Sequence, residues 1–379
     1  MSNTPVPDLV PDPVPVLVVG AGGMGRAWMR TVLASPEARL VGVVDVVGGA
    51  ADAAVAEVLP EAERAAIVTG TELLEVAARS GAEAVIDVTI PAAHHQVTAD
   101  ALHAGYPVLG EKPCAANLAE AVSLAGHAEA TGQLFMISQS RRNNPHLREA
   151  RRLADELGGA GIVDTRFTKA PRFGGFRDRM EQPLLVDMAI HAFDAGRVLV
   201  PGLPETVTAT SYNPAWSWYD GDAAATATIT YDSGAVHTYS GSWCAPGAET
   251  SWNGDWVIGC GGGSVHWDGE TPPVAHSADG TSTPGNDPGS EERWELEDSL
   301  ARFCAALRGG PTPDTEVHAN VWTQAIVEAA VRSAETGQRV ALADLLDDAL
   351  VAARKLDSQD GRSQVLTAWK TGATGLGAG

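Results

Sequence analysis

The chain has 379 residues, which is enough for two domains and a large buried core. Its 26 Lys and Arg against 48 Asp and Glu give a formal net charge of −22, which argues against nucleic acid and anionic membranes as general partners. A hydrophobic share of 44% excludes wholesale disorder, and no apolar run approaches the roughly 18–20 residues of a membrane helix.

Short runs of Val, Ile and Leu alternate with Ala-rich helical stretches from residue 14 to about residue 139. This alternation predicts a doubly wound parallel sheet, because strands covered by helices on both faces are apolar throughout. One helix starts at Asn117, with Glu120 as its capping partner, and ends before Gly132. The predicted strands are residues 15–20, 39–46, 65–70, 83–91, 106–113 and 134–138. The Pro-rich residues 1–13 before them predict an extended or disordered arm.

From about residue 140 the strand-like segments alternate apolar residues with Thr and Ser, which is typical of an antiparallel sheet with one open face. We expect an α+β domain over residues 140–345 and a C-terminal extension with a flexible tail over 346–379. Residues 270–290 are rich in Pro, Gly and Ser and predict a surface loop. The expected strands are residues 162–170, 205–213, 224–232, 235–243, 255–260 and 263–267, with helices over 145–157, 183–200, 291–309 and 318–337.

A glycine motif directly follows the first strand and opens the first helix. Gly20 permits a tight turn, Gly22 lets the backbone approach a pyrophosphate, and Gly25 allows the helix to pack closely on the strand. Asp45 ends the second strand, where its carboxylate can bind both ribose hydroxyls and repel a 2′-phosphate. The N-terminal domain is therefore predicted to be a Rossmann domain that binds NAD in preference to NADP.

Two further motifs carry candidate catalytic groups. Glu111 and Lys112 follow the strand at 106–113, at the sheet edge where open α/β sheets bind ligands. Asp187, His191 and Asp194 recur at helical spacing in an otherwise apolar segment, which predicts one shared face. Carboxylates are costly to bury unless they are paired, so this arrangement suits a general base in which a carboxylate orients the imidazole.

Together these motifs resemble the glucose–fructose oxidoreductase / inositol dehydrogenase (Gfo/Idh/MocA) family over about residues 14–345. The resemblance is carried by GAGGMG at 20–25, TIPAAHH at 89–95, GEKP at 110–113, SRRNNP at 140–145, DMAIHAFD at 187–194, FCAALRGG at 303–310 and AIVEAAVRSAETGQRV at 325–340. It implies a Rossmann domain followed by a domain with a large open sheet, and Lys112, Asp187 and His191 as the catalytic trio.

The resemblance and the motifs give two sets of expected binding residues. Those expected at the cofactor are Gly20, Gly22, Gly23, Met24, Gly25, Asp45, Pro91, His94, His95, Glu111 and Lys112. Those expected at the substrate are Lys112, Arg142, Arg172, Arg177, Asp187 and His191.

The chain departs from the family pattern at two places. Gln182, Pro183, Leu184 and Ala189 stand where the family often has glycines around the helix of the catalytic carboxylate and histidine. The segment after Pro91 is one residue short, so that either His94 or His95 can be its active-site histidine.

The expected reaction is the NAD-dependent oxidation of a ring hydroxyl on a sugar, a sugar derivative or a cyclitol. His191 removes the hydroxyl proton, Lys112 stabilises the developing charge on the oxygen, and Asp187 orients His191 or holds a neighbouring hydroxyl. One alternative is an NAD-dependent glycosidase, which oxidises its sugar transiently, eliminates the aglycone, adds water and reduces the product again. The other is a catalytically silent NAD-binding regulator, against which the presence of all three catalytic residues argues.

Two compositional features bear on the substrate. Residues 169–179, here called the basic segment, contain four cations and one acid, so they bind an anionic sugar such as a uronate or a sulfo-sugar, or pair with surface acids. Tryptophans of the second domain offer sugar-stacking faces or pack in the core or at an oligomer interface. The six tryptophans are Trp216, Trp218, Trp243, Trp252, Trp256 and Trp267.

The expected partners and compartment follow from what the chain lacks. No signal peptide is recognisable, and the four separated cysteines form neither a disulfide framework nor a Cys/His metal-binding spacing. We therefore expect a cytoplasmic protein without a metal, which acts on a small carbohydrate and forms a homodimer or homotetramer through its open sheet.

Overall fold

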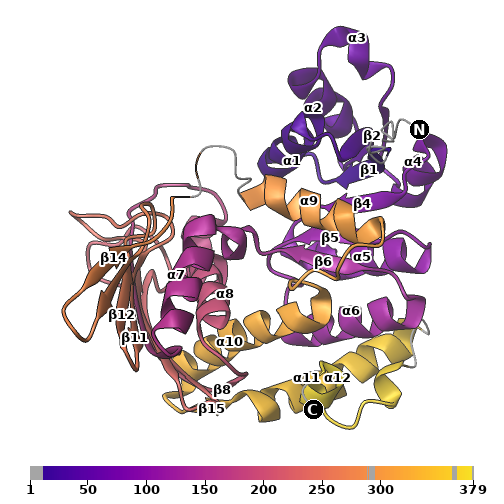
Figure 1. Cartoon of the computed structure of the whole chain (residues 1–379). Coiled ribbons are helices and arrows are strands. Elements are labelled where there is room, and N and C mark those ends of the chain that lie inside the picture. Colours follow the sequence, from indigo (N-terminus) through magenta and orange to yellow (C-terminus); the bar gives the residue numbers. More distant parts are fainter. Residues whose placement is uncertain (1–11, 288, 290–294, 361–364, 378–379) are drawn as a thin grey trace, which may run out of the picture.

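The computed structural model describes residues 12–287, 289, 295–360 and 365–377. The chain forms a parallel-sheet domain and a second domain with a large mixed sheet, which lie side by side (Figure 1). Nearly all of the arm predicted at residues 1–13 lies outside the described residues. None of the described helices has both the length and the apolarity that a membrane crossing requires.

The first domain contains the predicted six-stranded parallel sheet in the order β3-β2-β1-β4-β5-β6. Its central strands are buried along their whole length because helices cover both faces, which explains their uniform apolar sequence. The order reverses between β1 and β4, which places a ligand site at the carboxyl ends of these strands. The strands are β1 (Val14–Val19), β2 (Ala38–Val44), β3 (Val68–Gly70), β4 (Ala84–Asp87), β5 (Val108–Glu111) and β6 (Phe135–Ser138).

One helix of the first domain, α6 (Leu118–Thr131), begins and ends where its local sequence signals place it. The Asn117 side chain accepts a hydrogen bond from the Glu120 backbone N–H at 3.0 Å, and Gly132 ends the same helix at φ +66°. The capping prediction is therefore confirmed. The helices are α1 (Gly23–Ala34), α2 (Ala50–Val58), α3 (Glu61–Arg64), α4 (Leu73–Ser80), α5 (Pro91–His103) and α6 (Leu118–Thr131).

The second domain is built on a nine-stranded sheet in the order β14-β13-β12-β11-β7-β10-β9-β8-β15. Neighbouring strands are antiparallel except for β7 and β10, which pair in parallel. The fold-class prediction is confirmed in both domains. The strands are β7 (Ala160–Thr168), β8 (Pro204–Tyr212), β9 (Ala224–Tyr231), β10 (Val236–Ser242), β11 (Asp255–Cys260), β12 (Gly263–Trp267), β13 (Val274–Ser277), β14 (Ser282–Pro284) and β15 (Val340–Ala341).

Helices cover one face of this sheet, on the side of the first domain (Figure 1). They are α7 (Pro145–Glu156), the segment η3–α8 and α10 (Val317–Thr336). In that segment η3 (Leu184–Ala189) is a π-helix, which continues into α8 (Ile190–Leu199). Buried and exposed residues alternate along β7 and β8, so the opposite face carries the polar side chains. The oligomer expected on that open face stays a prediction.

Two segments are more ordered than the sequence predicted. Residues 270–290 contain the hairpin β13–β14, whose Asp279-Gly280 turn is a hairpin signal that the Pro and Gly content obscured. The C-terminal region is packed rather than flexible as far as it is described: α11 (Leu342–Asp360) lies on α6, and a short turn, η4 (Val365–Thr367), follows it. The last element, α12 (Gly372–Gly375), has a capping box at Thr371.

Helix α9 (Glu295–Leu307) follows the large sheet in sequence but packs on the first domain against α1 and β6. Its buried Leu300 and Phe303 belong to the same apolar cluster as Trp28. The chain therefore crosses between the domains more than once, and a boundary drawn along the sequence does not follow the packing.

Candidate functional site

The glycine motif forms a tight turn between β1 and α1. Gly20 has φ +101°, and a Cβ there would lie 2.5 Å from the Val88 carbonyl oxygen, so a larger residue does not fit. A Cβ on Gly25 would overlap the carbonyl oxygen of Gly20. By contrast, a Cβ at Gly22 or Gly23 would meet nothing within 4 Å. Gly20 and Gly25 therefore make the turn possible, and Gly22 and Gly23 leave an open backbone surface for a ligand.

The N-terminus of α1 is suited to an anion. Its N-cap Gly22 provides no side-chain hydrogen bond, so the first N–H groups and the positive end of the helix dipole remain available. Met24, in the first turn, is half exposed. These features, with the open surface at Gly22 and Gly23, fit the pyrophosphate of a dinucleotide.

Asp45 lies directly after β2 and beside this turn. Its Oδ2 accepts a hydrogen bond from the Ala21 backbone N–H at 2.8 Å, and its Oδ1 accepts one from Val47 N–H at 2.9 Å. Each carboxylate oxygen has a second lone pair, so the group can also accept hydrogen bonds from ribose hydroxyls. The residues present therefore fit the adenosine half of NAD.

Lys112 and Asp187 meet at the carboxyl end of β5, although they come from different domains. The Lys112 ammonium donates to Asp187 Oδ1 at 2.7 Å and to the Asp187 carbonyl oxygen at 2.8 Å. Arg177 Nε donates to the other carboxylate oxygen at 2.6 Å. Burial opposes ionisation of Asp187, but the two cations outweigh it and hold its pKa below the ordinary value.

His191 lines a cavity between α8 and the large sheet, together with Arg141, Met188, Tyr239 and Trp252. Its pKa lies well below the ordinary value, because burial and then the nearby cations Arg141 and Lys112 disfavour the imidazolium. The imidazole is therefore neutral at physiological pH and can accept a proton.

The expectation of a single face for Asp187, His191 and Asp194 is wrong. The π-helical turn of η3 changes the spacing that a regular α-helix would give, so that Asp187 faces Lys112 while Asp194 faces the interior. Among the described residues, no hydrogen bond joins His191 to either carboxylate. Asp187 instead contacts Lys112 and Arg177.

Arg142, expected at the substrate, is instead enclosed in an ion pair. Its Nε and Nη2 both donate to the Asp194 carboxylate at 2.9 Å, and its Nη1 reaches Asp314 at 3.1 Å. Its neighbour Arg141 lines the cavity with His191 and donates to the Trp252 carbonyl oxygen. The two arginines diverge because they lie on a 3₁₀ turn, η1 (Ser140–Asn143), which sequence spacing did not reveal.

His94 and His95 also point to different places. His94 Nδ1 lies 2.8 Å from the carbonyl oxygen of Pro113, directly after Lys112, and its Nε2 lies 3.1 Å from that of Thr89. His95 instead reaches Ser123 on α6, at 2.9 Å. The structure thus places His94 beside the Lys112–Pro113 step and directs His95 towards α6.

Two other expected cofactor residues occupy the same strand edge. Glu111 accepts a hydrogen bond from the Trp28 indole N–H at 2.8 Å, and its other oxygen accepts one from the Lys112 backbone N–H at 3.2 Å. Burial raises the pKa of the Glu111 carboxyl group. Pro91 opens α5 at the end of β4. Glu111 therefore connects helix α1 to the backbone of Lys112.

The basic segment is largely paired within the chain. Lys169 Nζ lies 3.0 Å from Glu249, Arg177 binds Asp187, and the Arg172 guanidinium lies 3.9 Å from the centroid of the Trp218 ring. Among the six tryptophans, Trp252, Trp256 and Trp267 line the cavity. Trp243 is buried and Trp216 is 61% exposed.

A Cys/His spacing along the sequence does not detect groups that are assembled from distant parts of the chain. The structure groups His95, His127 and Asp357, which lie far apart in the sequence, with their ligand atoms all within 4.8 Å of one another. This group lies between α5, α6 and α11.

Comparisons with known proteins agree with this geometry. Residues 14–139 match the oxidoreductase family with an NAD-binding Rossmann fold (GFO_IDH_MocA), and residues 156–265 match the GFO/IDH/MocA C-terminal domain. The uncharacterized protein y4oX of Sinorhizobium fredii is 27% identical over 89% of this chain and 98% of its own. The D-apiose dehydrogenase of Paraburkholderia graminis is 27% identical over 69% of this chain and 73% of its own.

A solved structure shows the same fold. An oxidoreductase from Agrobacterium radiobacter, crystallised with NAD+, L-tartaric acid and magnesium, superimposes with a TM-score of 0.76 at 19% identity, over 88% of this chain and 99% of that one. The two family models together match more than half of the chain, in the order and at the places that the glycine turn and the large sheet occupy. The chain therefore belongs to the Gfo/Idh/MocA family of NAD-binding oxidoreductases.

Proposed function

We propose that the protein oxidises a ring hydroxyl of a sugar, a sugar derivative or a cyclitol with NAD. The observation that carries the proposal is the meeting of Lys112 with Asp187 at 2.7 Å, next to the cavity that the neutral His191 lines. We assign these groups the roles of hydrogen-bond donor, positioning carboxylate and proton acceptor, and the electrostatic influence of Lys112 on His191 supports their proximity.

In the mechanism we propose, His191 accepts the proton of the substrate hydroxyl because its imidazole is neutral. Lys112 donates a hydrogen bond to the same oxygen and stabilises the negative charge that develops there. Asp187 holds the Lys112 ammonium in place through its carboxylate and its backbone carbonyl oxygen. Bound NAD supplies the hydride acceptor.

The charges around the site bear on the substrate class. Lys112 and Arg177 both contact the Asp187 carboxylate and Arg141 lies near it, which favours an oxygen that becomes negative during the reaction. The similarity to a D-apiose dehydrogenase supports a polyhydroxylated substrate. Arg172 is exposed and, among the described residues, contacts the Trp218 ring rather than an acid, so an anionic substituent on the sugar would bind there.

Substitution of the catalytic groups tests the proposal, once a thermal-shift screen of sugars and cyclitols with NAD has identified a substrate. Lys112→Met and His191→Ala should each lower kcat by about 10²–10⁴-fold, while NAD still binds, because both groups act at the reacting oxygen. Matched controls are Lys370→Met and His276→Ala, whose side chains are exposed. Near-native kcat in either catalytic variant would refute that residue's role.

The same assay separates the rival functions. A glycosidase would release a chromogenic aglycone from a glycoside without accumulating NADH, whereas a dehydrogenase forms NADH in proportion to its product. A silent regulator would bind NAD but turn over no member of the screen.

Cofactor preference provides an independent test of the dinucleotide site. We expect NAD to bind at least about tenfold more tightly than NADP, because the Asp45 carboxylate repels a 2′-phosphate. Asp45→Ser should narrow this ratio without abolishing NAD binding. Titration of both cofactors by tryptophan fluorescence measures the two affinities, and equal values in the native protein would contradict the assignment.

A further inference from the structure

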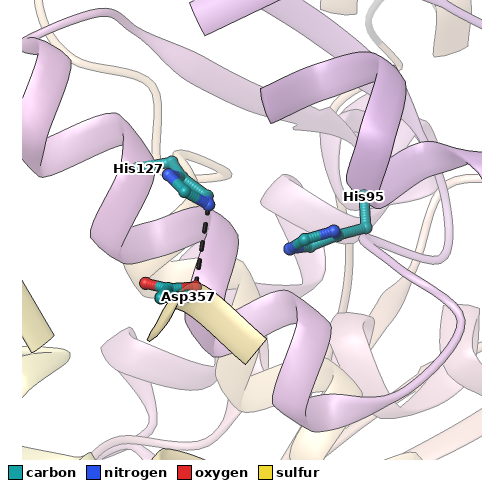
Figure 2. Close-up of side chains that lie close together, drawn as sticks. All are labelled: His95, His127 and Asp357. Atoms are coloured by element: carbon teal, nitrogen blue, oxygen red, sulfur yellow. Dashed lines mark ion pairs between the residues drawn. The ribbon is translucent and has the colours of Figure 1, made fainter. Parts of the chain in front are cut away.

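The group of His95, His127 and Asp357 lies outside the proposed catalytic site, where α5, α6 and α11 pack together (Figure 2). All three side chains are buried, with exposed fractions of 9%, 0% and 3%. Figure 2 shows the two imidazoles approaching the Asp357 carboxylate from two different helices. The residues therefore form a small polar centre inside an otherwise apolar helix interface.

The ligand atoms of the group lie within reach of a single metal ion, and a chain of hydrogen bonds through Ser123 already joins His95 to Asp357. His127 Nε2 lies 3.7 Å from Asp357 Oδ1, which is too long for a hydrogen bond. Bonds of roughly 2.0–2.1 Å to zinc in a tetrahedral site place two ligand atoms about 3.3–3.5 Å apart. The observed separations, all within 4.8 Å, thus need only small side-chain movements to surround an ion.

Neighbouring side chains provide the outer contacts that such a site uses. His127 Nδ1 lies 2.9 Å from His103 Nε2, which leaves His127 Nε2 directed at the carboxylate. A ligating histidine commonly donates its other ring N–H in this way, which fixes its orientation. The Ser123 hydroxyl donates to Asp357 Oδ1 at 2.5 Å and therefore accepts from His95 Nε2–H at 2.9 Å. Zinc binding through this nitrogen releases its proton and exchanges the hydrogen bond to Ser123 for the metal.

We propose that His95, His127 and Asp357 bind a zinc ion that clamps helix α11 to the first domain. Two imidazole nitrogens and one carboxylate oxygen suit zinc, whereas magnesium and calcium prefer oxygen ligands alone. Three protein ligands leave the fourth position to a water molecule. The ion joins α11 to the two helices that carry His95 and His127.

The experiment uses the full-length protein after treatment with a chelator, with Zn²⁺ alone as the probe. We expect calorimetric titration to give one equivalent of Zn²⁺ per chain, and Tm to rise with the Zn²⁺ concentration. Co²⁺ in the same site should give the visible absorption bands of a tetrahedral complex. Neither readout depends on enzymatic activity, so the outcome is independent of the proposed reaction.

Near-isosteric variants show whether these residues hold the ion. Asp357→Asn and His127→Gln should each weaken Zn²⁺ binding at least tenfold and remove the Co²⁺ bands. Ser123→Ala should keep Zn²⁺ affinity within a few-fold, because the hydroxyl is not a ligand. The matched control is His266→Gln, which alters an exposed histidine 2.7 Å from Asp255.

Three results would overturn the proposal. The first is native protein that binds less than a tenth of an equivalent of Zn²⁺ and shows no change in Tm. The second is native affinity in folded Asp357→Asn and His127→Gln variants. Should these variants fail to fold, the Co²⁺ spectrum of the native protein decides, and the absence of tetrahedral bands would show that the group is only a hydrogen-bonded cluster.

Discussion

Asp187 and Asp194 lie on one continuous helical segment, but their surroundings differ. The Asp187 side chain keeps 15% of its surface exposed and shares two cations beside the cavity. The Asp194 side chain keeps 2%, and Arg142 and Thr323 enclose it with hydrogen bonds of 2.7–2.9 Å. Fixed donors thus enclose the charge of Asp194, whereas the charge of Asp187 contacts a lysine beside a cavity. We infer that Asp194 stabilises the fold and that Asp187 acts in the proposed reaction.

The helix itself produces this difference. The π-helical turn of η3 ends at Ala189, between the two carboxylates, and it directs Asp187 towards the first domain. Asp194 follows on regular α8 and faces α10, from which Thr323 donates its hydroxyl proton. π-Helical turns often occur at functional sites because they redirect one side chain without ending the helix.

The largest effect expected from this comparison is on stability. Asp194→Asn should lower the free energy of unfolding by about 3–5 kcal/mol, because the buried Arg142 keeps only the exposed Asp314 as a counter-charge and the buried Arg197 loses its ion pair with Asp194. Chemical denaturation with matched m-values measures this loss. A loss below about 1 kcal/mol would show that the enclosed carboxylate is not structurally essential.

Asp187→Asn should act mainly on turnover. We expect kcat to fall by about 10–100-fold, because the Lys112 ammonium loses the charge that positions it, while the Tm changes less than in Asp194→Asn. Separate measurement of kcat and KM distinguishes a role in positioning Lys112 from a role in binding the sugar, because a positioning role should leave KM for the sugar little changed. Equal losses of Tm in the two variants would remove the distinction between the carboxylates.

The smallest expected effect concerns pH. Activity in the oxidative direction requires neutral His191, whose pKa is lowered first by burial and then by Arg141 and Lys112. We therefore expect kcat/KM to be lost only well below pH 6.5, as the pH falls through the lowered pKa. Arg141→Gln removes one repelling charge, so the acid limb should move to higher pH. An unchanged limb would indicate that another group controls it.

The sequence predicted a residue's position correctly where the local backbone or packing admits essentially one type of residue. Gly20, Gly25 and Asp45 occupy the predicted places because a positive φ, a close helix approach and a strand end each leave few alternatives. The strands of the first domain were recognisable from their apolar runs, since burial on both faces requires such runs.

The remaining features depend on contacts between distant segments. Neighbouring arginines diverge on a 3₁₀ turn, neighbouring histidines on α5 point to opposite sides, and the carboxylates of η3–α8 separate across a π-helical turn. The spacing of a regular α-helix does not predict the directions in which these side chains point. The group that includes His127 and Asp357 is likewise assembled by the packing of α11, a helix that the sequence had assigned to a C-terminal extension.

During translation, the six strands of the first domain are complete at Ser138, long before α9 is synthesised at residues 295–307. Until then, the apolar surface around Trp28 that Leu300 and Phe303 will cover faces water. The face of α6 that packs against α11 is covered later still, because α11 follows α9 in the sequence. The nascent N-terminal domain is thus an incomplete folding unit during most of its synthesis, and chaperones that shield apolar surface would act on it in that interval.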